Sequence, residues 1–345
     1  MTSSRIFTAL VAAALFAAPA LAQTPKTAAP AAAPATPDDT NQVSELVVVA
    51  HPQGPAMWQL KYGQAEMTIM GAVSPIAQQQ RWDRRPLLAA MEGARLVLLP
   101  PKSDLGPLQV MSLMTANVWK ARIIGDVEPR MPADLRARFV RDRMEFKQPA
   151  SRYAHWKPAV AGFLLLTDAR HYLGLSMGKP GTTVAKLAKE RNIRTDAIGS
   201  VSALALFKLA TQLDEKQNMS CLGDFVDQAE QERDQAIKLD AVHMNDDWAR
   251  GDVLAVNARY RLPPVQRCLM MAPGAHQVIE REMTKGTERL WAELQKPGKT
   301  VAVIDMAWLL PRDGVLDRLK AKGATVGEPP QVSGPARTDA DDDKD

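Results

Sequence analysis

The sequence is poor in the residues that build the common catalytic and metal-binding sites. Its 345 residues include only five histidines and two cysteines. No histidine belongs to a His-x-x-x-His or His-x-x-Glu pair, and two cysteines cannot complete a structural zinc site. A Gly-x-Ser-x-Gly elbow and a glycine-rich phosphate loop are also missing. These absences exclude zinc fingers, P-loop enzymes and serine hydrolases of the elbow type.

The apolar stretch near the N-terminus is too short for an ordinary membrane span. It covers residues 6–18, follows Arg5, and precedes the small-x-small pattern Ala20-Leu21-Ala22. This order predicts a signal peptide over residues 1–22, cleaved near Ala22, and a periplasmic or secreted mature chain. An uncleaved anchor is the alternative. No transmembrane span is expected in the mature chain.

Both ends of the mature chain have compositions that cannot form a packed core. Residues 23–45 are rich in alanine, proline and threonine, which predicts a disordered, extended linker. Residues 329–345 end with five aspartates among the last seven residues, which predicts an acidic disordered tail. The folded domain is therefore expected over residues 46–328, a length sufficient for one large α/β domain.

The charge pattern gives no sign of a nucleic-acid partner. The formal net charge is +4, and the basic residues cluster in residues 136–143, RARFVRDR. A nucleic-acid-binding surface would add aromatic stacking groups or a known module, and the sequence has neither. We interpret this cluster as a solvated helix face, near anionic lipid or an envelope polymer.

The two cysteines, Cys221 and Cys268, are predicted to form a disulfide. An exported protein matures in an oxidising compartment, where such a pair is readily oxidised. Two buried free thiols are the alternative.

Hydrophobic periodicity predicts strands at both ends of the domain and helices between them. Residues 57–70 alternate around Gly63-Gln64, which predicts a hairpin. A helix over residues 85–95 and a strand over residues 96–99 follow. The centre reads as mostly helical, including segments at 132–143, 159–173, 183–191, 202–213, 224–237 and 275–294.

The C-terminal part, residues 299–327, predicts a second unit of strand, helix and strand. Residues 301–304 form an unbroken apolar run, as in a strand buried on both faces. Asp313 can cap the next helix, and Gly323 can end it before a strand at 324–326. Ligands in such units bind at the carboxyl end of the strand, here residues 305–312.

The two ends together resemble the TraB/GumN family, whose relatives include the Tiki metalloproteases and, more distantly, erythromycin-esterase-like folds. The resemblance rests on residues 54–100 (GPAMWQLKYGQAEMTIMGAVSPIAQQQRWDRRPLLAAMEGARLVLLP) and residues 300–326 (TVAVIDMAWLLPRDGVLDRLKAKGATV). It implies an α/β fold with a small, mostly parallel sheet built from both chain ends and a large helical insertion. It also implies a divalent transition metal held through two Gly-x-x-His motifs.

Neither motif is intact in this chain. The first pairs Gly71 with Ser74 in place of histidine, and the second has Asp305 and Trp308 in place of glycine and histidine. The family arginine matches Arg281. The carboxylates expected after the first unit and near the central strand are also altered, with leucine and proline at 98–100 and only the displaced Asp196 at 196–199.

These departures predict a catalytically inactive pseudoenzyme without a cofactor. A serine hydroxyl is a poor ligand for such a metal, and an indole N–H only donates. The partner would be a peptide, a glycan or an envelope protein. An active metal-dependent hydrolase or peptidase with rearranged ligands around Asp305, Asp313 or Glu92 is the alternative, and a purely structural envelope protein is the third.

Overall fold

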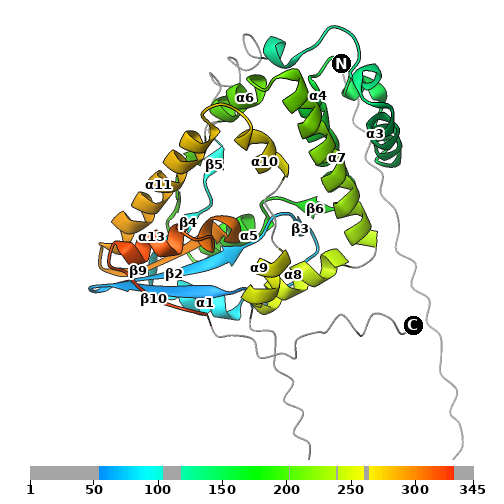
Figure 1. Ribbon diagram of the computed structural model, residues 1–345. Helices are drawn as coiled ribbons and strands as arrows, with labels where there is room; N and C mark the ends of the chain where they lie inside the picture. Colours follow the sequence, from blue (N-terminus) through cyan, green and yellow to red (C-terminus); the bar gives the residue numbers. More distant parts are fainter. Residues whose placement is uncertain (1–53, 104–117, 202, 238–239, 260–263, 330–345) are drawn as a thin grey trace, which may run out of the picture. The chain divides into compact units, whose positions relative to one another are not determined.

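The computed structural model describes most of the predicted domain, namely residues 54–103, 118–201, 203–237, 240–259 and 264–329 (Figure 1). The predicted signal peptide, the predicted linker and residues 46–53 lie outside the described residues, as does the predicted tail after Pro329.

Six strands form the central sheet, in the order β10-β1-β2-β9-β4-β7. Their bounds are β1 Met57–Tyr62, β2 Ala65–Ala72, β4 Ala94–Leu99, β7 Thr195–Ala197, β9 Gly298–Asp305 and β10 Thr325–Gly327. β1 pairs antiparallel with β2 and β10, whereas β2, β9, β4 and β7 pair in parallel. The sheet is therefore mostly parallel and combines strands from both ends of the domain, as predicted.

The predicted hairpin is formed by β1 and β2. Trp58 and Leu60 are buried in β1, while their neighbours Gln59 and Lys61 are exposed, which is the alternation of a strand with one covered face. Gly63 has a φ of 56° in the turn between the strands. β2 lies inside the sheet and is buried along nearly its whole length. The hairpin thus connects the edge region of the sheet to its centre.

Helices cover both faces of the sheet. One face packs against α1 Arg85–Met91 and α5 Lys179–Glu190. The other face packs against α8 Asp240–Arg250, α9 Val253–Arg259, α11 Ala275–Leu294, α12 Met306–Leu309 and α13 Val315–Ala321. In β9, Val301 and Val303 face the first layer, and Ala302 and Ile304 face the second. The apolar run of β9 is unbroken because both of its faces are covered.

The C-terminal unit forms the predicted strand, helix and strand and differs from its prediction in one cap. Asp313 has a φ of 62° and does not cap α13, because Gly314 occupies the N-cap position. The carboxylate of Asp317 instead accepts a hydrogen bond from the Asp313 N–H at 3.1 Å. Gly323, with a φ of 103°, follows α13 as predicted. β10 runs parallel to β9, but β1 and β2 lie between them.

Most of the central helices form a second core. Its helices are α3 Ala133–Glu145, α4 Pro158–Tyr172, α6 Ala203–Thr211, α7 Glu215–Ile237 and α10 Pro264–Met270. α4 and α7 approach closely because Gly162 has no side chain: a Cβ there would lie 2.9 Å from the Phe225 ring. α7 begins earlier than the predicted residue 224. Asp214 and Gln217 exchange reciprocal hydrogen bonds at its start, at 2.7 and 3.0 Å, as in a capping box.

Cys221 of α7 and Cys268 of α10 form the predicted disulfide. The S–S distance is 2.11 Å and the Cα–Cα distance is 5.2 Å. The bond links two helices of the second core across a sequence separation of 47 residues. In the chain-entropy model a loop of this length stabilises the fold by roughly 3–4 kcal/mol.

The basic cluster of α3 is largely paired with acidic side chains. Arg138 and Arg141 both contact the carboxylate of Glu230 on α7, and Arg143 lies 2.9 Å from a carboxylate oxygen of Glu128. Arg138 and Arg141 remain partly exposed, as the predicted solvated face requires. Their charge, however, is largely compensated within the chain. The cluster is therefore a weaker site for an anionic surface than its sequence indicates.

Two short sheets and several single turns complete the described structure. β3 Ile76–Ala77 pairs with β6 Leu175–Ser176, and β5 Lys102–Ser103 pairs with β8 Ser200–Val201. Single 3₁₀ turns lie at Val118–Ala121, Glu128–Arg130 and Ala150–Arg152. Within the part of the chain that the structure describes, no helix combines the length and apolar character needed to cross a membrane.

Candidate functional site

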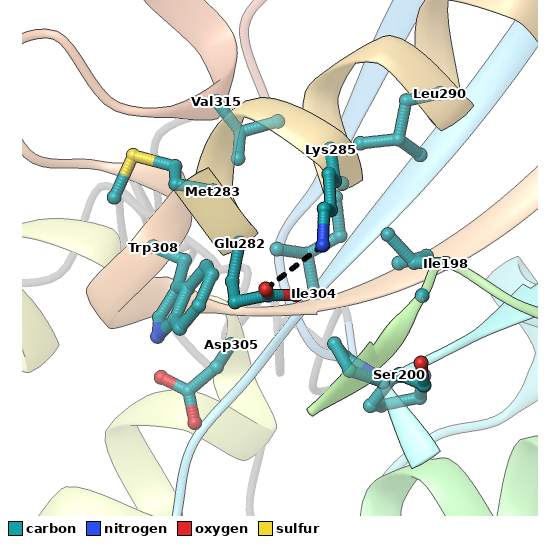
Figure 2. Close-up of a pocket in the computed structure, with 14 residues that line it drawn as sticks. Ile198, Ser200, Glu282, Met283, Lys285, Leu290, Ile304, Asp305, Trp308 and Val315 are labelled. Atoms are coloured by element: carbon teal, nitrogen blue, oxygen red, sulfur yellow. Dashed lines mark hydrogen bonds and ion pairs between the residues drawn. The ribbon is translucent and has the colours of Figure 1, made fainter. Parts of the chain in front are cut away.

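A cleft of about 240 Å³ lies at the carboxyl ends of β9, β4 and β7 (Figure 2). This is the end of a parallel sheet at which ligands bind in α/β proteins. The side chains and backbone that line the cleft come from these strand ends and from α11, α12 and α13: Pro100, Pro101, Ile198, Gly199, Ser200, Glu282, Met283, Lys285, Gly286, Leu290, Ile304, Asp305, Trp308 and Val315. Two predicted site residues, Asp305 and Trp308, are among them.

Asp305 ends β9 and caps the helix that follows. It is the N-cap residue of α12, and its carboxylate oxygen Oδ1 accepts a hydrogen bond from the Ala307 N–H at 2.9 Å. An aspartate at this position satisfies one of the unpaired N–H groups of the first helical turn. Part of its acceptor capacity therefore serves the fold at the floor of the cleft.

Trp308 lies on α12 and forms one wall of the cleft. Figure 2 shows its ring beside Glu282 and above the carboxylate of Asp305. The ring is partly buried and packs against the core that contains α11 and α13. The bulky ring thus occupies the mouth of the cleft, where the family resemblance implies an imidazole.

The first degenerate motif reaches the neighbouring strand end but not the cleft lining. β2 and β9 pair in register, with Ala72 opposite Asp305. Ser74, two residues further on, turns away: its hydroxyl donates a hydrogen bond to the Met177 carbonyl at 2.8 Å. The structure therefore brings the two motifs to adjacent strand ends, but it does not place Ser74 with Trp308 among the residues that line the cleft.

Gly71 is required for packing at this strand end. A Cβ at this position would lie 2.9 Å from both Met306 and the Trp58 ring. Its carbonyl accepts a buried hydrogen bond from the Trp248 indole N–H at 2.8 Å. The glycine of the first motif thus has a structural role that does not depend on its missing histidine.

Charged residues of α11 form the polar rim of the cleft. Glu282 lies 3.1 Å from the Lys285 ammonium group, as the dashed line in Figure 2 shows, and 3.3 Å from the Arg281 guanidinium group. Arg281, the predicted counterpart of the family arginine, is mostly exposed and does not line the cleft. Its contact with Glu282 connects it to the rim of the cleft.

The α11 wall could have been found from helical spacing. Glu282, Gly286 and Leu290 follow one another at intervals of four residues, which places them on one side of a helix. The contributions of Pro100, Pro101 and residues 198–200 depend on strand order instead. A single sequence carries no direct signal for that order.

The remaining candidate residues lie elsewhere. Asp196 points to α11, where its carboxylate accepts a hydrogen bond from Arg289 at 2.8 Å. The hydrogen bond from the Ala197 N–H lowers the pKa of Asp196 most, and the positive charge of Arg289 lowers it further. Glu92 precedes β4, whose first residue Ala94 lies beside Lys299. About 20 Å of strand therefore separates Glu92 from Asp305.

The histidines are not part of the cleft lining. His155, His171 and His276 do not line the cleft, while His51 and the His243 side chain lie outside the described part.

Glu293 fixes α11 to the sheet at the end opposite the cleft. Its buried carboxylate meets Arg95 of β4 at 2.7 Å, Arg289 at 2.7 Å and Lys296 at 2.8 Å. Burial acts to raise the pKa of Glu293, but the hydrogen bonds from Lys296 and Arg95 and the nearby positive charges outweigh it and lower the pKa to about 2. The charged form of Glu293 therefore stabilises the helix that walls the cleft.

The free energy of unfolding is expected to fall at acidic pH because Glu293 becomes protonated. A carboxylate with a depressed pKa contributes its full stabilisation above the ordinary value near 4.5 and loses it as the pH falls toward 2. The difference in unfolding free energy between the natural chain and Glu293→Gln, measured by urea denaturation, should be on the order of 3 kcal/mol at pH 7 and shrink below pH 4.5. Glu288→Gln, on an exposed part of the same helix, is the control and should cost less than about 1 kcal/mol. A pH-independent difference for Glu293→Gln would contradict the expectation.

The residues at the cleft do not fit the transition metal that the family resemblance implies. The Trp308 indole offers only a donor, the Ser74 hydroxyl is turned to Met177, and Glu282 is paired with two cations. In the described ranges, no group of three or more His, Cys, Asp and Glu side chains is arranged to hold a metal ion. A hydrolytic metal site needs several imidazole or carboxylate donors around one open position.

Comparison with known proteins identifies the family of this chain and finds no similar individual protein. The sequence pattern that defines the TraB/PrgY/gumN family matches residues 56–328. No curated protein and no solved structure matches the chain. The matched range covers the sheet, the helical insertion and every residue that lines the cleft.

Proposed function

We propose a binding role without catalysis for this chain, which belongs to the TraB/PrgY/gumN family. The cleft at the ends of β9, β4 and β7 is the proposed binding site. A peptide, a glycan or an envelope protein are the partner classes that its sequence favours. The protein would thus retain the scaffold of its family and use it to hold a ligand.

One observation carries this proposal: the side chains at the strand ends are engaged in structural contacts, and a ring stands at the cleft mouth. Ser74 bonds the Met177 carbonyl, Asp305 caps α12, and Trp308 lines the wall. None of these groups is placed to hold a metal ion that would activate a water molecule for hydrolysis. Their arrangement supports a rigid, largely apolar cleft instead.

The proposed location is the cell envelope or the exterior, after removal of residues 1–22. The charged start, the apolar stretch and the Ala20-Leu21-Ala22 pattern support this location. We expect mass spectrometry of the mature protein to find Gln23 at its N-terminus. A chain that retains Met1 in the membrane fraction would favour an anchored envelope protein and contradict cleavage.

Metal content and hydrolysis test the non-catalytic role. We expect elemental analysis of the purified protein to find no stoichiometric transition metal. We also expect no cleavage of peptide or ester substrates above the blank when zinc, manganese or cobalt is added. The control for residual activity is Asp305→Asn, which removes the charge of the carboxylate nearest the cleft floor. A stoichiometric metal whose removal abolishes cleavage would overturn the proposal and favour a hydrolase with rearranged ligands.

A further inference from the structure

The depth of the cleft is apolar and large enough for a small ring system. Its inner wall is formed by Ile198, Leu290, Ile304 and Val315, all buried in the described structure. An apolar protein cavity of about 150 Å³ accepts benzene. The 240 Å³ of this cleft therefore accommodates more than one benzene ring, yet it is smaller than the roughly 300–1,000 Å³ of sites that hold drug-sized ligands.

Three rings line the cleft nearer its mouth. Trp308 presents an indole ring on one side, and the pyrrolidine rings of Pro100 and Pro101 contribute on the strand side. Aromatic rings gain from offset or edge-to-face contact with an indole beyond the gain from burial alone. A flat aromatic ligand therefore fits these walls better than a branched or saturated one.

The charges around the cleft favour a neutral ligand. Arg281 and Lys285 are positive, Glu282 and Asp305 are negative, and Glu282 is paired with both cations. These four charges sum to zero, so a charged ligand would find no net attraction to offset the cost of placing its charge in a mostly apolar cleft. A carboxylate has about four acceptor positions, so Glu282 can accept a ligand N–H or O–H in addition to its contacts with Arg281 and Lys285.

We propose that this cleft binds a small, neutral aromatic molecule of two fused rings whose N–H or O–H group donates to the carboxylate of Glu282. The inference rests on the proposed binding function and adds a ligand class beyond the peptide, glycan and envelope-protein partners named there. The rings would lie between Trp308 and the two prolines, above the apolar floor. The polar group would face the rim.

A substitution at Gly286 can fill the cleft without weakening helix α11. It lies on α11 and lines the cleft, and a Cβ there would make only an ordinary contact of 3.4 Å with Ile198. Gly286→Leu should fill the cleft while it improves helix propensity. Gly223→Leu on α7 is the matched control, because nothing lies within 4 Å of a Cβ at that position.

Indole is the probe, and its binding is measured by ligand-observed saturation-transfer NMR with a titration. We expect indole to bind the natural chain and Gly223→Leu alike, and to bind Gly286→Leu at least tenfold more weakly. 1-Methylindole, which lacks the N–H, and cyclohexylmethanol, which lacks the aromatic ring, should both bind more weakly than indole. Circular dichroism establishes that each variant is folded.

Three results would overturn the inference: no binding of indole, equal binding by Gly286→Leu, or binding of cyclohexylmethanol as tight as that of indole. The test is separable from that of the proposed function. A metal-dependent hydrolase would refute the non-catalytic role even if Gly286→Leu blocks indole. A metal-free, inactive protein that does not bind indole would refute only the assignment of ligand class.

Discussion

Replacement of Trp248 by alanine is expected to lower the free energy of unfolding by about 3–5 kcal/mol. The side chain is 1% exposed and lies between α8 and the sheet. Its indole N–H donates to the Gly71 carbonyl at 2.8 Å, and its ring meets the edge of Trp82 at a centroid distance of 5.7 Å. The substitution leaves a large cavity and an unpaired carbonyl beside the first motif. Urea denaturation at neutral pH measures the loss.

Trp248→Phe separates the hydrogen bond from the packing. Phenylalanine retains much of the apolar volume but cannot donate to the Gly71 carbonyl. We expect it to cost about 1–3 kcal/mol, the range for leaving one buried polar group unsatisfied. A loss below about 1 kcal/mol for Trp248→Ala would show that α8 is not held to the sheet by this residue.

Replacement of Arg170 by methionine is expected to cost about 3–5 kcal/mol, because it leaves a buried charge without its partner. Arg170 on α4 donates three hydrogen bonds to the carboxylate of Glu232 on α7, at 2.7, 2.9 and 3.2 Å. The side chains are 11% and 4% exposed. After the substitution, Gln228 at 2.8 Å is the remaining side chain shown to donate to Glu232. The pair joins the two most closely packed helices of the second core.

The double variant Arg170→Met/Glu232→Leu provides the control. Two apolar groups can replace a buried ion pair at little cost, so we expect the double variant to recover most of the stability lost in the single variant. Denaturation of the natural chain, the two single variants and the double variant measures the coupling. Additive losses would contradict a direct interaction between the two side chains.

Features that depend on neighbouring residues were predictable. The β1–β2 hairpin follows from apolar alternation around Gly63, and β9 follows from its unbroken apolar run. The disulfide could be predicted because Cys221 and Cys268 are the only two cysteines of the sequence, which is predicted to be exported. α11 occupies residues 275–294, as its periodicity indicated. In each case the determining signal lies within one segment or within a single possible pair.

Two helix starts and one side-chain direction were not predicted. The cap of α13 was misassigned because the left-handed conformation of Asp313 and the close approach at Gly314 are set by contacts with the preceding turn. The start of α7 was placed too late because the Asp214–Gln217 capping box precedes its charged segment. The sequence left open whether Ser74 lies near Trp308, and in the structure the Ser74 hydroxyl donates a hydrogen bond to a carbonyl 103 residues away.

The sequence alone indicated the carboxyl end of β9 as the place to look for a site. It also determined that Ser74 and Trp308 stand where the two family motifs have histidine. Only the tertiary structure decided which residues share the cleft. Strand order brings Pro100, Ile198 and Asp305 to one end of the sheet, and the placement of α11 adds Glu282. The physical reason is that periodicity and capping act over a few residues, whereas the cleft is made by parallel strands that pair across long separations in the chain.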